Sequence, residues 1–169
     1  MTVDLVQDVH RGREAFDRHL AQALRGRQLA ELGWRRHDDL TLLVDMSAVH
    51  PQTAKTDSFL LRLVFDHYPN NPPSAQFVNP ETKKYEGTQD ASHIPQIEGA
   101  QHIHFHPNYN GTGQLICSST TLEFYKVQHG VDAAHRWDAR PHSFLDTIAA
   151  IKSGLAQPFY RGRHPASSP

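Results

Sequence analysis

The sequence predicts one α+β domain over residues 1–164, followed by a flexible tail at residues 165–169. Apolar residues recur with a helical period near both ends of the chain, and they alternate with polar residues in between. The strands expected there follow one another without intervening helices, which indicates an antiparallel meander. Of the 169 residues, 38% are hydrophobic and 21% are charged, a globular balance at a length that suits one core.

The first expected element is an amphipathic helix at residues 11–32. Gly33 follows it as a stop signal. The apolar side of this N-terminal helix recurs at helical spacing in Phe16, Leu20, Ala23 and Leu24.

Strands are expected next, where apolar and polar residues alternate with a period of two. The expected strands are residues 40–46, 59–65, 76–78 and 102–105. Between the second and third strands the segment 68–73 must turn, because its three prolines cannot donate hydrogen bonds to a sheet.

C-terminal helices are expected to pack on one face of the sheet. Residues 143–155 form a clear amphipathic pattern behind Pro141, whereas residues 120–127 fit either a helix or a strand. The apolar side of the last helix consists of Phe144, Ile148, Ile151 and Leu155.

Composition and charge exclude several classes of function. Lys and Arg number 17 against 18 Asp and Glu, so no basic surplus favours nucleic-acid binding. No apolar stretch approaches the roughly 20 residues of a membrane-spanning helix. A single cysteine cannot form an internal disulfide, which fits a reducing compartment, and we expect the cytoplasm.

Several local motifs occur in a fixed order along the chain. Tyr68-Pro69, followed by Pro72-Pro73, comes directly after an alternating strand. The remaining motifs are the tripeptide His106-Pro107-Asn108, the segment 113–117 that ends in the only thiol, Cys117, and Trp137 ahead of the last helix.

This order resembles the ubiquitin-conjugating enzymes. That family shares the Tyr-Pro and Pro-Pro turn, the His-Pro-Asn tripeptide, a Gly-x-Ile-Cys-like nucleophile segment and a tryptophan before the next helix. The resemblance covers roughly residues 11–160. It implies a UBC-like fold in which Cys117 carries a ubiquitin-like modifier as a thioester, Asn108 stabilises the oxyanion, and His106 with Pro107 holds Asn108 in place.

The resemblance also implies the partners. An activating enzyme consumes ATP and delivers the modifier, and a protein or another amine accepts it, so this chain is expected to need no cofactor. Transfer between thioesters is nearly isoenergetic and requires a thiolate rather than a strong base. Asn108 precedes Cys117 by nine positions, across a turn in which Gly111 and Gly113 allow sharp folding.

The chain departs from the family pattern in four places. The spacing from Asn108 to Cys117 is one residue longer than usual, and insertions are expected at residues 81–101 and 118–136. Family members often carry an acidic residue beyond the tryptophan helix to orient the attacking lysine, but residues 157–159 contain no carboxylate. The chain therefore looks more like the divergent bacterial members of the family.

Histidines leave further interpretations open. His129 and His135, in the second insertion, could lower the pKa of the thiol or accept a proton from an amine. A metalloenzyme could use His102, His104 and His106, or Cys117 with His129 and His135. The chain could also be a non-catalytic module that binds a ubiquitin-like protein, or a cysteine hydrolase.

Overall fold

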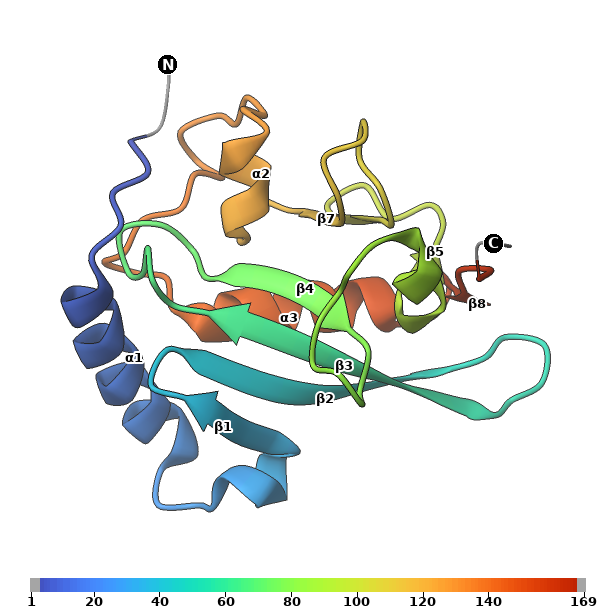
Figure 1. Cartoon of the computed structure of the whole chain (residues 1–169), viewed down its shortest axis with the longest axis horizontal. Coiled ribbons are helices and arrows are strands. Elements are labelled where there is room, and N and C mark those ends of the chain that lie inside the picture. Colours follow the sequence, from blue (N-terminus) through green and yellow to red (C-terminus); the bar gives the residue numbers. More distant parts are fainter. Residues whose placement is uncertain (1–3, 167–169) are drawn as a thin grey trace.

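A computed structural model describes residues 4–166, and its elements form an α+β fold (Figure 1). The helices are α1 (Val9–Leu24), α2 (Leu122–Lys126) and α3 (Phe144–Leu155), with the short 3-10 helices η1 (Leu29–Leu32) and η2 (Thr88–His93). The strands are β1 (Trp34–Asp38), β2 (Thr41–Val49), β3 (Thr56–Val64), β4 (Ser74–Val78), β5 (Pro95–Ile97), β6 (His104–His106), β7 (Leu115–Cys117) and β8 (Tyr160–Arg163).

Helix α1 is shorter than the predicted helix at residues 11–32. It begins after Asp8, whose carboxylate accepts the Arg11 N–H at 3.0 Å as an N-cap. It ends at Leu24 because Arg25 and Gly26 both adopt left-handed backbone angles, with φ of 49° and 82°. The apolar residues that follow this break, Leu29 and Leu32, belong to η1, which packs against the core as a separate element.

The predicted meander is confirmed as an antiparallel sheet in the order β1-β2-β3-β4. The expected strands at residues 40–46, 59–65 and 76–78 correspond to β2, β3 and β4. Strand β1 was not predicted, because its exposed residues after Trp34 carry no alternating apolar pattern. Residues 68–73 form the expected turn between β3 and β4.

One face of this sheet forms the main core. It receives alternating side chains of β2 and β3, together with aromatic residues of α1 and α3. Phe16 stacks on Phe65 with ring centroids 3.9 Å apart, and Phe144 meets both rings edge-on. The other face carries the small cluster Leu43, Leu60 and Val78, beside an open pocket of about 400 Å³.

Helix α3 confirms the predicted helix at residues 143–155. Ser143 and Asp146 form a capping box at its start. The helix lies behind the sheet in Figure 1 and packs against its core face, whereas α2 lies against β4 and β7. The chain does not end in helices as expected, because β8 follows α3 and pairs with β5.

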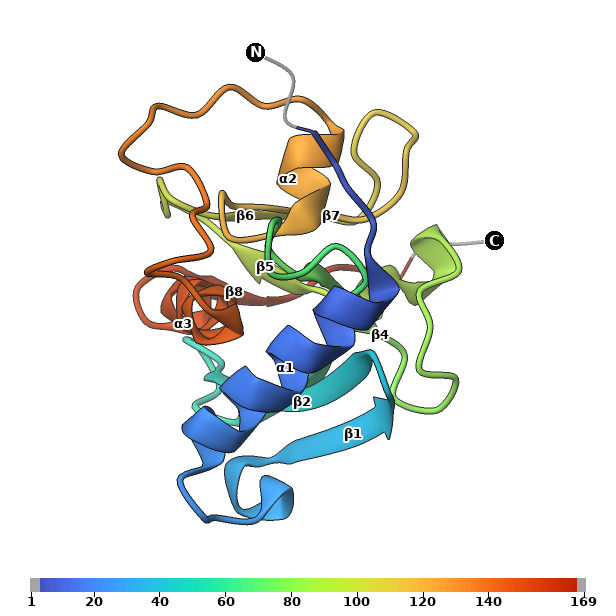
Figure 2. The same ribbon diagram turned by 90° about the vertical axis from the view of Figure 1, so that its left-hand side faces the viewer.

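A two-stranded layer lies above the main sheet. Strand β6, at the end of the predicted strand 102–105, pairs with β7 rather than joining the meander. Figure 2 shows β6, β7 and α2 together on this side of the molecule, with α1 crossing the end of the sheet below. Residues 165 and 166 of the predicted tail form no helix or strand, and residues 167–169 lie outside the described part of the chain.

Within residues 4–166, no helix combines the length and apolar character needed to cross a membrane.

Helix α1 approaches the chain after β3 so closely that Gly12 has no room for a side chain. A Cβ atom at this position would overlap the carbonyl oxygen of Phe65. We predict that Gly12→Ala lowers the free energy of unfolding by about 1–3 kcal/mol, despite the better helix propensity of alanine. Chemical denaturation measures this, and Gly130→Ala, where the Cβ meets open space, is the matched control. Equal stability of the two variants would contradict the close approach.

Candidate active site around Cys117

The antiparallel pair β6–β7 positions Cys117. In this pair His104 lies opposite Cys117, Phe105 opposite Ile116, and His106 opposite Leu115. Phe105 and Ile116 are buried in the main core, so the alternate residues His104 and Cys117 point to the other face. The pair thus anchors the thiol through the core while leaving Cys117 half-buried and His104 exposed.

The turn from β6 to β7 contains Asn108. A backbone hydrogen bond closes this turn, since the Tyr109 N–H donates to the Gly113 carbonyl at 2.8 Å. Gly111 and Gly113 adopt φ of 79° and 104°, so the sequence-based expectation that these glycines shape the turn is confirmed. The Asn108 Oδ1 accepts the Gly113 N–H at 3.2 Å, which orients the carboxamide and leaves the Nδ2 hydrogens as a separate pair of donors.

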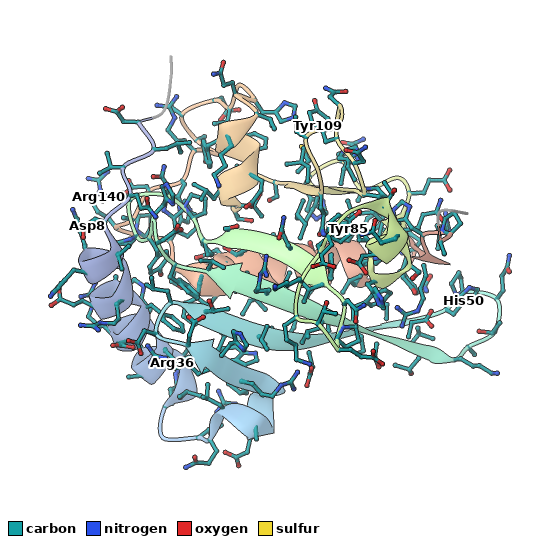
Figure 3. All side chains as sticks on the ribbon, viewed as in Figure 1. Asp8, Arg36, His50, Tyr85, Tyr109 and Arg140 are labelled. Atoms are coloured by element: carbon teal, nitrogen blue, oxygen red, sulfur yellow. The ribbon has the colours of Figure 1, made fainter. Side chains whose placement is uncertain are left out.

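The tripeptide containing Asn108 is held by a residue that the sequence did not single out. The Tyr85 hydroxyl donates to the Pro107 carbonyl at 2.6 Å. Tyr85 comes from the segment 81–101, and Figure 3 shows it beside the loop that crosses in front of the sheet, with Tyr109 above. Burial raises the pKa of Tyr85 to about 12, so its hydroxyl remains a donor at neutral pH. An aromatic residue within a polar insertion is the only signal that could have indicated this role.

His106 lies among other rings. Its centroid is 5.3 Å from that of Tyr109 and 6.1 Å from that of His104. Burial, and then the nearby His104 and His129, lowers the pKa of His106. His106 is thus a half-buried imidazole packed beside Tyr109, and its role in holding the backbone of Asn108 stays a prediction.

Trp137 joins the Tyr-Pro turn to the segment that follows Cys117. Its indole Nε1 donates to the Pro69 carbonyl at 2.8 Å, and its backbone N–H donates to the Tyr125 hydroxyl at 2.9 Å. The Tyr125 hydroxyl in turn donates to the Ser119 carbonyl at 2.9 Å, two residues beyond Cys117. The structure thus brings Pro69 and Trp137, 68 residues apart in sequence, into direct contact.

Tyr68, the residue before Pro69, links the same turn to helices α1 and α3. The N–H of Phe144, in the first turn of α3, donates to the Tyr68 hydroxyl at 3.2 Å. The same hydroxyl is bonded to Nδ1 of His19 on α1. The Tyr68 ring also packs on Trp137, so α1, the turn and the start of α3 meet at one buried side chain.

The residues directly after Cys117 are fixed by threonine hydroxyls. Thr121 Oγ1 contacts the carbonyls of Ile116 and Ser118 at 2.6 and 2.9 Å. Thr147 on α3 donates to the Thr120 carbonyl at 2.8 Å. These hydrogen bonds fix the backbone between Cys117 and α2. Residues 120–127, whose pattern fitted either a helix or a strand, contain the helix α2.

The environment of the thiol favours its protonated form. Burial raises the pKa of Cys117 above its ordinary value. A thiol must lose its proton to act as a nucleophile. Nucleophilic chemistry at this position near neutral pH therefore needs a group that accepts the proton.

The two histidines proposed as assistants lie in different surroundings. His129 packs against Tyr109 and Phe124, with ring centroids 5.6 and 5.2 Å apart. His135 is exposed and bonds the carboxylate of Asp132 at 2.8 Å. His129 therefore belongs to the ring cluster above β6, whereas His135 is engaged in a surface hydrogen bond with Asp132.

The two candidate metal sites are not formed. Among residues 4–166, no three His, Cys, Asp or Glu side chains are grouped so as to hold a metal ion. His102 lies before β6, where its Nε2 contacts Ser153 Oγ on α3 at 2.6 Å. The row of His102, His104 and His106 expected from period two is thus interrupted, because residue 102 is not part of the strand.

Comparison of the chain with protein-family models, with curated proteins and with solved structures found no match.

We predict that Tyr85→Phe loosens the Asn108 turn. The variant removes the donor to the Pro107 carbonyl, which should lower the free energy of unfolding by about 0.5–1.5 kcal/mol. Hydrogen exchange at the amides of residues 108–113 should accelerate in the same variant. Tyr109→Phe, which removes a hydroxyl within the turn itself, is the control, and similar exchange in both variants would argue against this role for Tyr85.

We predict that stability falls as the pH decreases below about 6.5. Burial lowers the pKa values of His19, His106 and His164 in the folded chain. Between the unfolded and folded pKa values the unfolded chain binds more protons, so unfolding becomes easier as the pH falls through that window. Denaturant unfolding above and below it should show a weaker pH dependence for His106→Gln than for wild type.

The exposed residue His37 supplies the control for this pH measurement. His37→Gln should retain the wild-type pH dependence. An unchanged slope for His106→Gln would show that burial of this imidazole does not contribute to the acid sensitivity.

Proposed function

We propose that this chain is a UBC-like carrier that accepts a ubiquitin-like modifier as a thioester on Cys117 and passes it to an amine or thiol acceptor. The observation that carries this proposal is the β6–β7 hairpin. One short antiparallel pair ends in Cys117 on one strand and leads into the His106-Pro107-Asn108 tripeptide on the other. A sulfur and a carboxamide donor thus belong to the same hairpin, with Cys117 at the open end of the pair and Asn108 in the turn.

The contacts between separated motifs support the same proposal. Tyr68-Pro69 and Trp137, which the family resemblance groups with the cysteine, are linked by the indole hydrogen bond to the Pro69 carbonyl. The order of an N-terminal helix, a four-stranded antiparallel meander, a cysteine-bearing segment and a further helix also agrees with a UBC-like fold.

The chemistry of loading follows from these groups. The Cys117 thiolate attacks the carbonyl carbon of a modifier thioester held on an activating enzyme, and a carbon–sulfur bond forms. The resulting oxyanion would accept a hydrogen bond from the Asn108 Nδ2 group, a kind of contact worth about 2.7–4 kcal/mol in other enzymes. Collapse of the intermediate breaks the old carbon–sulfur bond and releases the thiolate of the activating enzyme.

Transfer repeats this sequence with a different nucleophile. An amine nitrogen attacks the carbonyl carbon, the carbon–nitrogen bond forms, and the bond to Cys117 breaks as the nitrogen loses a proton. We propose that the reaction takes place in the cytoplasm, where the lone thiol stays reduced. The partners are an activating enzyme, a ubiquitin-like modifier and an amine-bearing substrate, and the departures from the family pattern favour a bacterial type of pathway.

We predict a thioester adduct when the chain is incubated with its activating enzyme, modifier and ATP. The adduct should disappear in reducing agent and should not form on Cys117→Ala, because no other thiol is present. Cys117→Ser should form an oxyester that resists reducing agent. Gel mobility with and without reducing agent reads out all three results, and an adduct on Cys117→Ala would refute the assignment.

We predict that Asn108→Ala loads the modifier but discharges it slowly. Loss of one oxyanion donor typically lowers the rate by about 10²–10³-fold. Single-turnover discharge to free lysine measures the effect. Gln52→Ala is the control and should discharge at the wild-type rate. It removes an exposed carboxamide at the β2–β3 turn, where the Gln52 N–H donates to the His50 ring at 3.2 Å; Figure 3 marks this turn by His50. Wild-type discharge by Asn108→Ala would remove the oxyanion role.

A further inference from the structure

The register of β6 and β7 places a histidine directly across from the thiol. His104 and Cys117 are cross-strand partners in the antiparallel pair. Directly opposite residues of such a pair project to the same face, with Cβ atoms about 4.5–5.5 Å apart. An imidazole and a thiol at this Cβ separation can exchange a proton through one water molecule.

The direction of the His104 side chain is supported by a second observation. Residues i and i+2 of a strand lie on one face, and the rings of His104 and His106 are 6.1 Å apart. Phe105 between them is buried in the core below. His104 therefore projects to the upper face, where it is exposed, and Cys117 projects there from the neighbouring strand.

The proposed reaction has a specific need for a base at this position. The thiol lies in a half-buried environment that favours the protonated form, so loading requires a proton acceptor. Transfer to an amine requires one again, because the attacking nitrogen must lose a proton. The segment 157–159 offers no carboxylate, and Gln157 donates through Nε2 to the carbonyl of Val49.

We propose that His104 is the proton acceptor for the Cys117 thiol during loading and for the attacking amine during transfer. This role rests on the proposed function and adds a catalytic residue to it. His104 would provide from the neighbouring strand what an acidic side chain near the end of the domain provides in many family members.

The protons and bonds balance in both steps. During loading His104 takes the proton of the Cys117 thiol, the thiolate forms the new carbon–sulfur bond, and the imidazolium protonates the departing thiolate of the activating enzyme. During transfer the amine forms the carbon–nitrogen bond, its proton goes to His104, and the bond to Cys117 breaks. The imidazolium then returns this proton to the Cys117 thiolate.

Other ionisable groups near the β6–β7 pair are engaged in their own contacts or exposed. Glu123 on α2 points away, since it bonds Ser74 and the Ala75 N–H of β4. Lys126 on the same helix is exposed. The groups packed around His106, which lies next to His104, are Tyr109 from the turn, His129 from the loop after α2 and His164 from the end of β8.

Alkylation of the thiol tests this inference independently of any modifier. Cys117 is the only cysteine, so the rate of reaction with iodoacetamide reports on its thiolate alone. In wild type the rate should rise with pH in two steps, and the lower step should depend on the His104 side chain. His104→Gln should lose the lower step and should react at least about threefold more slowly at neutral pH.

His102→Gln is the matched control, because this histidine lies outside the strand and contacts Ser153 on α3. It should retain both steps. His104→Ala with added imidazole provides a second variant, and partial recovery of the rate is expected. Superimposable profiles for wild type and His104→Gln would overturn the role of His104 even where the thioester forms, whereas failure of wild type to form a thioester would remove the proposed function and leave the alkylation result intact.

Discussion

The arrangement of the molecule depends on the hydrogen bonds of two buried aromatic side chains, Tyr68 and Trp137. A buried hydroxyl or indole nitrogen without a partner costs free energy, so each of these groups has to meet a specific acceptor or donor. Tyr68 satisfies this need with His19 of α1 and the first turn of α3, and Trp137 does so with the carbonyl of Pro69. Segments from the beginning, middle and end of the chain are thereby fixed relative to one another.

The segment around Cys117 is connected to these two aromatic side chains. Trp137 also binds the Tyr125 hydroxyl, which reaches the backbone just after Cys117. On the other side, Phe105 and Ile116 anchor the β6–β7 pair in the same core. The thiol therefore lies between two segments that are anchored in the core. Such an arrangement would suit the carrier role proposed above, because catalytic groups act best when they are positioned in advance.

Sequence patterns predicted the elements whose side chains alternate regularly between core and solvent. Leu42, Val44 and Met46 indicate β2 because they all enter one core. The same reasoning could not find β1 or end α1 at Leu24. Residues 35–38 of β1 are exposed, and the left-handed conformation of Arg25 reflects the path to η1 rather than a local preference. The motifs predicted Cys117 and Asn108 as catalytic residues, and these assignments stay predictions. The contact from Tyr85 comes from a separate segment, and the position of His104 depends on the register of β6 and β7, which the sequence pattern did not give.

The self-contained turn of the hairpin has a consequence for how the two strands tolerate variation in length. Tyr109 and Gly113 close this turn through their own backbone, while the pairing of His106 with Leu115 sets the register below it. An extra residue within residues 109–113 would lengthen the turn without changing the register of β6 and β7. Sequence distance between the carboxamide and the sulfur is thus decoupled from their distance in space, so a changed count of residues is a poor guide to whether the two groups can cooperate.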